Sequence, residues 1–338
     1  MAVVALLGCS GQAPDRMDGA PPASRPGLVR RDFTRIAMGV QCKVVLWAPD
    51  GELAREAAEA AFARIAQLED ALSDWRPDSE LNRLCRARGP VPVGEDLWLA
   101  LGVGLEVARQ SDGAFDPTVG PLVQLWRQSR RTRQLPPAAA LAAARARVGW
   151  HKVRLDAARR TVELQNEGMA LDLGGLGKGL AAQAAVDLLR ARGLPQCLVA
   201  LAGDVAVGAA PPDRPGWRVE VAGGQAREPA GTLWLCHAAV STSGDTEQFV
   251  AIDGVRYAHI VDPRTGLGIQ HRWSVTVVAP RGEQADALST AVWVLGEDRG
   301  RALLATRSGV AAVFETRVGE DRAARAVWDP GQVLRWER

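Results

Sequence analysis

Residues 169–192 read MALDLGGLGKGLAAQAAVDLLRAR, and this stretch shows the local architecture of the chain most clearly. The apolar start at 169–173 predicts a short strand, and residues 180–192 place Leu and Ala at helical spacing. Glycines between them let backbone N–H groups approach an anion at the helix N-terminus, beside the charge of Lys178. This glycine loop is not a Walker A loop, because Gly179 follows Lys178 where Ser or Thr is required. A tight turn for close helix packing explains the glycines equally well, so the loop alone predicts no phosphate site.

Outward from this stretch, short strands gather in groups with helices between the groups. This arrangement predicts an α+β fold rather than a regular βαβ winding. Helices are expected at 53–72, 97–110, 136–147, 180–192 and 283–295, with a further helix start at Ser79. Strands are expected at 33–47, 153–155, 161–164, 196–201, 217–221, 232–236, 248–252, 273–279 and 310–314.

Composition excludes some classes of protein. The 338 residues carry a net charge of +2, and no basic stripe with interleaved aromatics is present, which argues against nucleic-acid binding. Apart from Cys9, the cysteines are Cys42, Cys85, Cys197 and Cys236. They lack CxxC spacing, so we expect buried free thiols rather than a zinc site or a disulfide framework. No stretch reaches the roughly 20 apolar residues that cross a membrane.

The N-terminal residues 1–9, MAVVALLGC, resemble a bacterial lipoprotein signal that would leave Cys9 as the lipidated first residue. A frayed N-terminus with an unimportant Cys is the alternative. Residues 10–31 are rich in Pro, Gly, Ser and Asp, a composition typical of a flexible tether. We therefore expect a signal at 1–9, a tether at 10–31 and one folded domain at 32–338.

Two further polar motifs are candidates for chemistry. HIVDPRTG at 259–266 places His259 and Asp262 in a turn-forming segment, where a His has a pKa suited to proton transfer at neutral pH. ADALSTA at 285–291 places Asp286 and Thr290 one helical turn apart, as two oxygen ligands for Mg²⁺ would be. Taken alone, a capped loop and an ordinary helix start explain both motifs better.

A third candidate is the loop GAFDPT at 113–118 together with Trp75. An aromatic ring beside a polar loop can stack on a flat ligand, and backbone groups next to Phe115 and Asp116 can bond the edge of that ligand. A Trp, however, lies in a protein core more often than it serves as a ligand platform.

These motifs occur together and in an order that resembles the FAD:protein FMN transferase family, the ApbE family. The resemblance runs from Phe33 to Val313. The segments that carry it are SDWRPDSELNRL, DGAFDPTVGPLVQLW, LDLGGLGKGLAAQAAVDLL, STSGD, YAHIVDPRTG and VTVVAP followed by ADALSTA. It implies an α+β fold with a flavin cleft, and many members of the family are periplasmic lipoproteins.

The resemblance also implies a role for particular residues. Metal ligands would be the side chains of Asp286 and Thr290 and a backbone carbonyl, that of Gly175. His259 matches the family's catalytic-loop His and would take the proton of the acceptor hydroxyl, with Asp262 as second choice. The implied contacts with FAD are Met38, Trp75 stacked on the isoalloxazine, Ala114, Phe115, Asp116, Asp172, Lys178, His259 and Ile260. The chain departs from the family pattern at Leu180, Thr246 and Ala202, which puts detailed flavin and partner contacts in question.

The implied reaction is Mg²⁺-dependent transfer of FMN from FAD to a Thr or Ser hydroxyl of a partner protein, with release of AMP. FAD would be the substrate, and the acceptor would belong to a membrane redox complex. The enzyme itself would be periplasmic and held at the inner membrane only by its lipid. Two alternatives stay open: a Mg²⁺-dependent FAD pyrophosphatase that yields FMN and AMP, and a non-catalytic FAD-binding lipoprotein.

Overall fold

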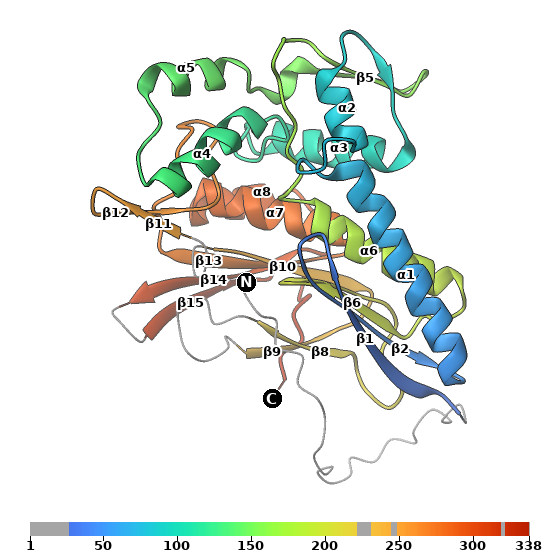
Figure 1. Ribbon diagram of the computed structural model, residues 1–338. Coiled ribbons are helices and arrows are strands. Elements are labelled where there is room, and N and C mark those ends of the chain that lie inside the picture. The colour runs from blue at the N-terminus through green and yellow to red at the C-terminus, as the bar shows by residue number, and fades with distance from the viewer. Residues whose placement is uncertain (1–26, 222–230, 245–248, 319–321, 338) are drawn as a thin grey trace.

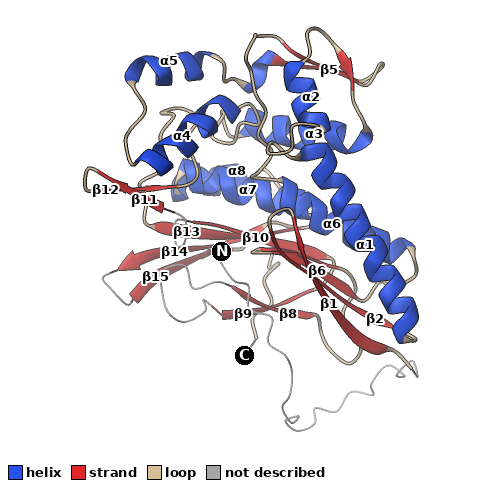
Figure 2. Ribbon diagram, viewed as in Figure 1, coloured by secondary structure: helices blue, strands red, loops and turns tan. Residues whose placement is uncertain are grey.

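An eight-stranded antiparallel sheet forms the centre of the computed structural model, which describes residues 27–221, 231–244, 249–318 and 322–337. The strand order is β1-β2-β6-β7-β10-β13-β14-β15 (Figures 1 and 2). The strands are β1 (Val29–Ala37), β2 (Val40–Ala48), β6 (Cys197–Leu201), β7 (Asp204–Val207), β10 (Ala238–Gly244), β13 (Trp273–Ala279), β14 (Ala311–Val318) and β15 (Arg322–Trp328). The predicted α+β class is confirmed.

Helices cover one face of this sheet and bury the main core (Figure 1). They are α1 (Gly51–Leu72), α6 (Gly177–Ala191), α7 (Gly282–Leu295) and α8 (Glu297–Leu304). Asp50 caps the start of helix α1, because its side chain accepts the N–H of Leu53 and so satisfies one free donor of the first turn. Its apolar side chains recur at helical spacing and are buried, including Ile65 and Leu68. Burial of this face holds the helix on the sheet.

The opposite face of the sheet is covered by the hairpin of β8 (Trp217–Val221) and β9 (Gly231–Leu235) (Figure 1). A second buried cluster lies there, with Trp217 and Leu233 among its members. The C-terminal segment closes it, because Trp336 packs on this cluster and Glu337 pairs with Arg218 at 2.7 Å. The sheet is therefore buried on both faces by separate cores.

Most of the remaining elements lie beyond the helical layer, on the side away from the sheet, while the hairpin of β11 (Phe249–Ile252) and β12 (Val255–Ala258) lies beside the end of α7 (Figure 1). The others are α2 (Glu80–Arg86), β3 (Val91–Pro92), α3 (Glu95–Gln110), α4 (Gly120–Thr132), α5 (Ala138–Ala146), a 3₁₀ turn (Trp150–Lys152), β4 (Val153–Asp156) and β5 (Thr161–Leu164). A third cluster joins α4 and α5 to the β11–β12 hairpin. Within it the Trp126 and Tyr257 rings meet edge to face with centroids 5.4 Å apart.

Several expectations need correction. The single strand expected at 33–47 is the β1–β2 hairpin, because Met38 and Gly39 both adopt positive φ and form a two-residue turn. Strand β1 begins at Val29, so the tether expected to end at residue 31 ends earlier. The strand expected at 169–173 reduces to one bridge between Ala170 and Val119.

Two other expectations concern the termini and the membrane. The expected signal at residues 1–9, with Cys9, lies outside the described residues, as does Thr246. Among the helices that the structure describes, none combines the length and apolar composition of a membrane span.

Helices α6 and α7 meet at their first turns through two glycines. A Cβ on Gly179 would lie 2.2 Å from the Gly282 carbonyl oxygen, and a Cβ on Gly282 would lie 2.1 Å from the Gly179 oxygen. Only glycine permits this approach, because real Cβ atoms do not come so close to another heavy atom. The contact brings Asp286 on α7 next to the glycine loop that begins α6. The alternative reading of the glycines, close helix packing, is therefore correct for Gly179.

Candidate active site

A pocket of about 420 Å³ opens between the glycine loop, α7, β10 and the elements of the outer layer. It gathers residues that are more than 200 positions apart in the sequence, from Val40 to Thr290. The predicted residues that line it are Trp75, Ala114, Phe115, Asp116, Asp172, Gly175, Lys178, His259, Ile260, Asp286 and Thr290. Two predicted residues, Met38 and Asp262, are not among its lining residues.

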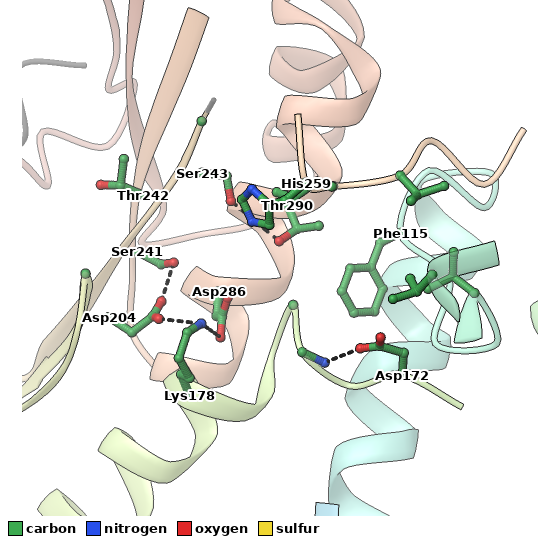
Figure 3. Close-up of a pocket in the computed structure, with 18 of the residues that line it drawn as sticks. Phe115, Asp172, Lys178, Asp204, Ser241, Thr242, Ser243, His259, Asp286 and Thr290 are labelled. Atoms are coloured by element: carbon green, nitrogen blue, oxygen red, sulfur yellow. Dashed lines mark hydrogen bonds and ion pairs between the residues drawn. The ribbon is translucent and has the colours of Figure 1, made fainter. Parts of the chain in front are cut away.

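Lys178 lies between two carboxylates rather than free in the pocket (Figure 3). Its Nζ is 2.8 Å from Asp204 and 3.8 Å from Asp286. Burial alone would lower the pKa of Lys178, but the two carboxylates outweigh it and raise that pKa. The expectation that Lys178 faces a phosphate is incomplete, because its charge is already shared by two acids.

Asp286 is almost fully buried at the start of α7. Its Oδ2 accepts the Gly179 N–H at 3.0 Å, so the carboxylate caps the first turn of α6. Burial, with the nearby Asp204 charge, raises the pKa of Asp286 to about 7, and Lys178 only partly offsets this. A neighbouring cation stabilises the ionised form of a carboxylate most strongly where burial makes that form costly.

The three residues that the resemblance implies as metal ligands lie together here. Thr290 follows Asp286 by one helical turn, and both line the pocket. Gly175 lies against Thr290, because a Cβ there would be 3.1 Å from Thr290 Oγ1 and 3.1 Å from the Phe115 ring. Within the described residues no group of three or more His, Cys, Asp or Glu side chains is placed to hold a metal. A cation here would depend on one carboxylate, an alcohol and a carbonyl, a hard donor set that suits Mg²⁺ with its remaining ligands from water or phosphate.

The sequence did not predict a row of polar groups that lies behind the three expected metal ligands. Asp204 on β7 and Ser241 and Ser243 on β10 line the pocket, and Ser289 on α7 is fully buried behind them. Neither β7 nor β10 was expected as a strand. The signal available was STS at 241–243, where serines separated by one residue point to the same face of a strand.

An aromatic and charged wall forms the outer side of the pocket. Trp75 is 72% exposed, and the Arg127 guanidinium lies 3.9 Å from the centre of its ring. Arg127 also pairs with Asp74 at 2.6 Å and with Asp172 at 3.4 Å. One face of the Trp75 ring is thus covered by Arg127, and a flat ligand can stack on the other face without displacing that cation.

The loop 111–119 is held rigid by Asp116. Its Oδ1 accepts the N–H and hydroxyl of Thr118, at 2.8 and 2.6 Å, and its Oδ2 accepts the Trp150 N–H at 3.0 Å. Burial nevertheless raises the pKa of Asp116, which these hydrogen bonds only partly counter. The carboxylate therefore fixes the loop, while Ala114 and Phe115 face the pocket.

His259 lies in the pocket next to Ser243 and Thr290 (Figure 3). Asp262 does not line the pocket. Its carboxylate accepts the Arg264 backbone N–H at 2.9 Å and pairs with the Arg264 guanidinium at 2.8 Å. That carboxylate stabilises the loop after β12, as in the capped-loop alternative, and this makes Asp262 the weaker candidate for a base. Met38 forms the β1–β2 turn, and its N–H donates to Glu69 at 3.0 Å.

The fold and site together define an α+β protein that can hold a cation and a phosphorylated, flat-ringed ligand in one pocket. A family model described as the ApbE family matches residues 38–314, and the chain belongs to this family.

Similar proteins with known names agree with this assignment. The FAD:protein FMN transferase of Treponema pallidum is 36% identical over 90% of both chains, and one from Klebsiella pneumoniae is 32% identical over 78% of this chain and 79% of its own. The apo flavinyl transferase ApbE of Pseudomonas stutzeri has a TM-score of 0.79 at 31% identity, covering 89% of this chain and 95% of its own. The flavin transferase ApbE of Vibrio cholerae has the same TM-score at 25% identity, covering 91% and 99%.

Proposed function

We propose that this protein transfers FMN from FAD to a Thr or Ser hydroxyl of a partner protein and releases AMP. One observation carries the proposal: the sequence blocks that match a family of FAD:protein FMN transferases converge on a single pocket. That pocket combines an aromatic wall at Trp75 and Phe115 with the polar cluster around Lys178 and Asp286. It thus offers surfaces for both the ring and the diphosphate of FAD.

A Mg²⁺ ion would be held by Asp286, Thr290 and the Gly175 carbonyl, and support for this comes from the three residues lining one pocket beside the glycine loop. When bound, such an ion supplies charge neutralisation on the diphosphate oxygens. The protein itself contributes the positive end of the α6 helix dipole, which favours an anion there. The Gly179 N–H at this end is already bonded to Asp286. Binding and orientation of this kind account for most of the catalysis in phosphoryl-type transfers.

His259 would accept the proton of the acceptor hydroxyl. The hydroxyl oxygen forms a bond to the phosphorus of the FMN half, the bond from that phosphorus to the bridging oxygen breaks, and AMP leaves with the bridging oxygen. Of the two predicted bases, His259 lines the pocket and Asp262 does not. An imidazole has a pKa near neutral pH and is suited to such a transfer.

The test separates transfer from its alternatives. Purified protein is incubated with FAD and Mg²⁺, with and without an acceptor protein, and AMP and covalently bound flavin are measured. AMP that appears only with acceptor, together with a covalently yellow partner, supports transfer. AMP and free FMN without acceptor would show a pyrophosphatase, and unchanged FAD in both samples would show a binding protein; either result contradicts the proposal.

We further propose that Cys9 carries a lipid that holds the enzyme on the periplasmic side of the inner membrane, near an acceptor subunit of a membrane redox complex. The support is the apolar segment that ends at Cys9 and the tether-like composition after it. Cys9→Ser should move the protein from the membrane fraction to the soluble fraction and abolish labelling with a radioactive fatty acid. Unchanged fractionation and labelling would contradict the anchor.

A further inference from the structure

A continuous row of hydroxyl groups runs behind the expected cation donors. Ser243 Oγ lies 3.5 Å from Thr290 Oγ1 and 2.9 Å from Ser289 Oγ. Ser289 Oγ lies 3.2 Å from Ser241 Oγ, which donates to Asp204 Oδ1 at 2.5 Å. We call this row, Thr290–Ser243–Ser289–Ser241–Asp204, the hydroxyl chain. Ser241, Ser243, Ser289 and Asp204 are each at most 6% exposed, so bulk water does not compete for their hydrogen bonds.

The direction of the hydrogen bonds in this chain follows from counting protons. A hydroxyl has one proton to donate and two lone pairs that accept. The Ser241 proton goes to the Asp204 carboxylate, and the Asp286 carbonyl, 2.9 Å from Ser289 Oγ, can only accept. Ser289 donates its one proton to this carbonyl, so its oxygen can take part in further hydrogen bonds only as an acceptor.

The same count then applies to the next two links. With the Ser289 proton committed, the contact between Ser243 and Ser289 is a hydrogen bond only if Ser243 donates. The contact between Ser243 and Thr290, at 3.5 Å the longest of the row, is in turn a hydrogen bond only if Thr290 donates. The Thr290 proton then points into the protein, towards β10, and the lone pairs of its oxygen remain available to the pocket.

We propose that the hydroxyl chain orients the Thr290 oxygen towards a divalent cation, so that Ser289 and Ser243 are positioning residues for metal binding. The inference rests on the proposed function only in taking Asp286 and Thr290 as cation donors. Asp204 ends the chain as an acceptor and is itself held by Lys178 at 2.8 Å. The chain thereby ties β7, β10 and α7 together behind the site. Groups behind the ligands that fix ligand orientation commonly raise metal affinity about 10–100-fold.

The test measures metal affinity directly. Mn²⁺ is titrated into the full chain, with and without FAD, and the free ion is followed by electron paramagnetic resonance. Ser289→Ala should raise the Mn²⁺ dissociation constant about tenfold or more. Ser243→Ala should have a similar effect, and Ser243→Thr, which keeps a hydroxyl, should restore affinity close to that of the wild type.

Thr276→Val is the matched control. Thr276 on β13 is 3% exposed and bonds Thr242 at 2.8 Å, outside the hydroxyl chain. Its substitution also removes a buried hydroxyl from the same sheet, so it should cost stability but leave Mn²⁺ affinity unchanged. An equal loss of affinity in Thr276→Val would show a general packing effect and overturn the proposal.

Other outcomes separate this inference from the proposed function. Wild-type affinity in both Ser289→Ala and Ser243→Ala, or absence of Mn²⁺ binding in the wild type with and without FAD, overturns the positioning role even if FMN transfer occurs. Mn²⁺ binding that weakens in the two alanine variants but not in Thr276→Val supports the positioning role, even if the wild type fails to flavinylate an acceptor. If Ser289→Ala does not fold, the pair Ser243→Ala and Ser243→Thr decides the question.

Discussion

At the scale of single residues, the cluster of Lys178, Asp204 and Asp286 determines what the inner end of the pocket attracts. One ammonium and two carboxylates, with contacts of 2.8 and 3.8 Å, sum to a charge of −1 when both acids are ionised, and a bound cation favours the ionised form of Asp286. A site with this net charge favours a divalent cation, and the bound cation in turn favours a diphosphate. The sequence predicted that Lys178 contacts the phosphates directly. It gave no sign of the pair with Asp204, which lies 26 positions later in the chain and reaches Lys178 only through tertiary folding.

The two principal candidates for chemistry should fail differently on substitution. Asp286→Ala removes both the expected metal ligand and the cap on the Gly179 N–H, so we expect loss of Mg²⁺-dependent FAD binding and of FMN transfer. His259→Ala removes only a proton acceptor and should lower the transfer rate about 10²–10⁴-fold while FAD binding persists. FAD binding is measured by flavin fluorescence and transfer by acceptor labelling. Normal turnover by Asp286→Ala would show that the metal assignment is wrong.

The cysteines lead to a second prediction at this scale. Free thiols were expected and are confirmed for all four described cysteines, but Cys236 is exposed and Cys85 is only partly buried. Burial raises the pKa of Cys42 and of Cys197 to about 12, and it also raises the pKa of Cys85. Because the thiolate is the reactive form, these three thiols stay unreactive at pH 8 in the folded protein and would ionise only at much higher pH.

Iodoacetamide at pH 8 should therefore modify Cys236 and spare Cys42, Cys85 and Cys197, as mapped by peptide mass spectrometry. The same reagent in 6 M guanidinium serves as the control, in which the four cysteines should all react. Modification of Cys42 in the folded protein at a rate equal to that of Cys236 would contradict the burial of Cys42.

At the scale of elements, long periodic segments were predictable and cooperative pairings were not. Helix α1 was predicted within two residues of its start because one apolar face repeats over its whole length. The β1–β2 hairpin was predicted as one strand, since its turn depends on the positive φ of Met38, an unusual residue for that conformation. Strand β10 was missed because STSG has weak strand propensity, and its pairing with β7 and β13 stabilises it.

The crossing of α6 and α7 offers a sharp test at this scale. Gly179→Ala places a Cβ against the Gly282 carbonyl and 2.7 Å from Asp286 Cβ, so the helices must separate. We expect a loss of about 1–3 kcal/mol in the free energy of unfolding, as for other overpacked sites, and weaker metal binding. Urea unfolding and Mn²⁺ titration measure the two effects.

Gly177→Ala is the matched control on the same first turn of α6. Its Cβ would meet only Met38 Cε at 3.7 Å, an ordinary contact. Because Ala is a better helix former than Gly, this variant should be as stable as the wild type or more so. Equal destabilisation by the two substitutions would indicate that the close helix approach is not the cause.

At the scale of the whole molecule, the sheet separates two cores with different roles. The helical face carries the pocket, and the opposite face is closed by β8, β9 and the C-terminal segment around Trp336. The sequence predicted the α+β class and most of the elements, but it could not predict this division. Strand order in an antiparallel sheet depends on contacts between distant segments, such as β2 with β6.

Deletion of residues 329–338 should therefore affect stability more than ligand binding. The deletion uncovers the second core and removes the pair of Glu337 with Arg218. We expect a loss of about 2–4 kcal/mol in the free energy of unfolding, by exposure of one or two large apolar side chains. FAD affinity of the protein that remains folded should be unchanged. A tenfold loss of FAD affinity at a temperature where the variant is folded would contradict the separation of the two cores.

The placement of Asp286 and Thr290 so late in the chain has a consequence for biosynthesis. A ribosome must complete most of the polypeptide before these side chains exist, whereas Trp75 and Phe115 are made early. The dinucleotide consequently has no complete binding place on a growing chain, and it cannot serve as a template around which the first half folds. A ligand that needs all of these contacts meets them together only after residue 290 has been synthesised.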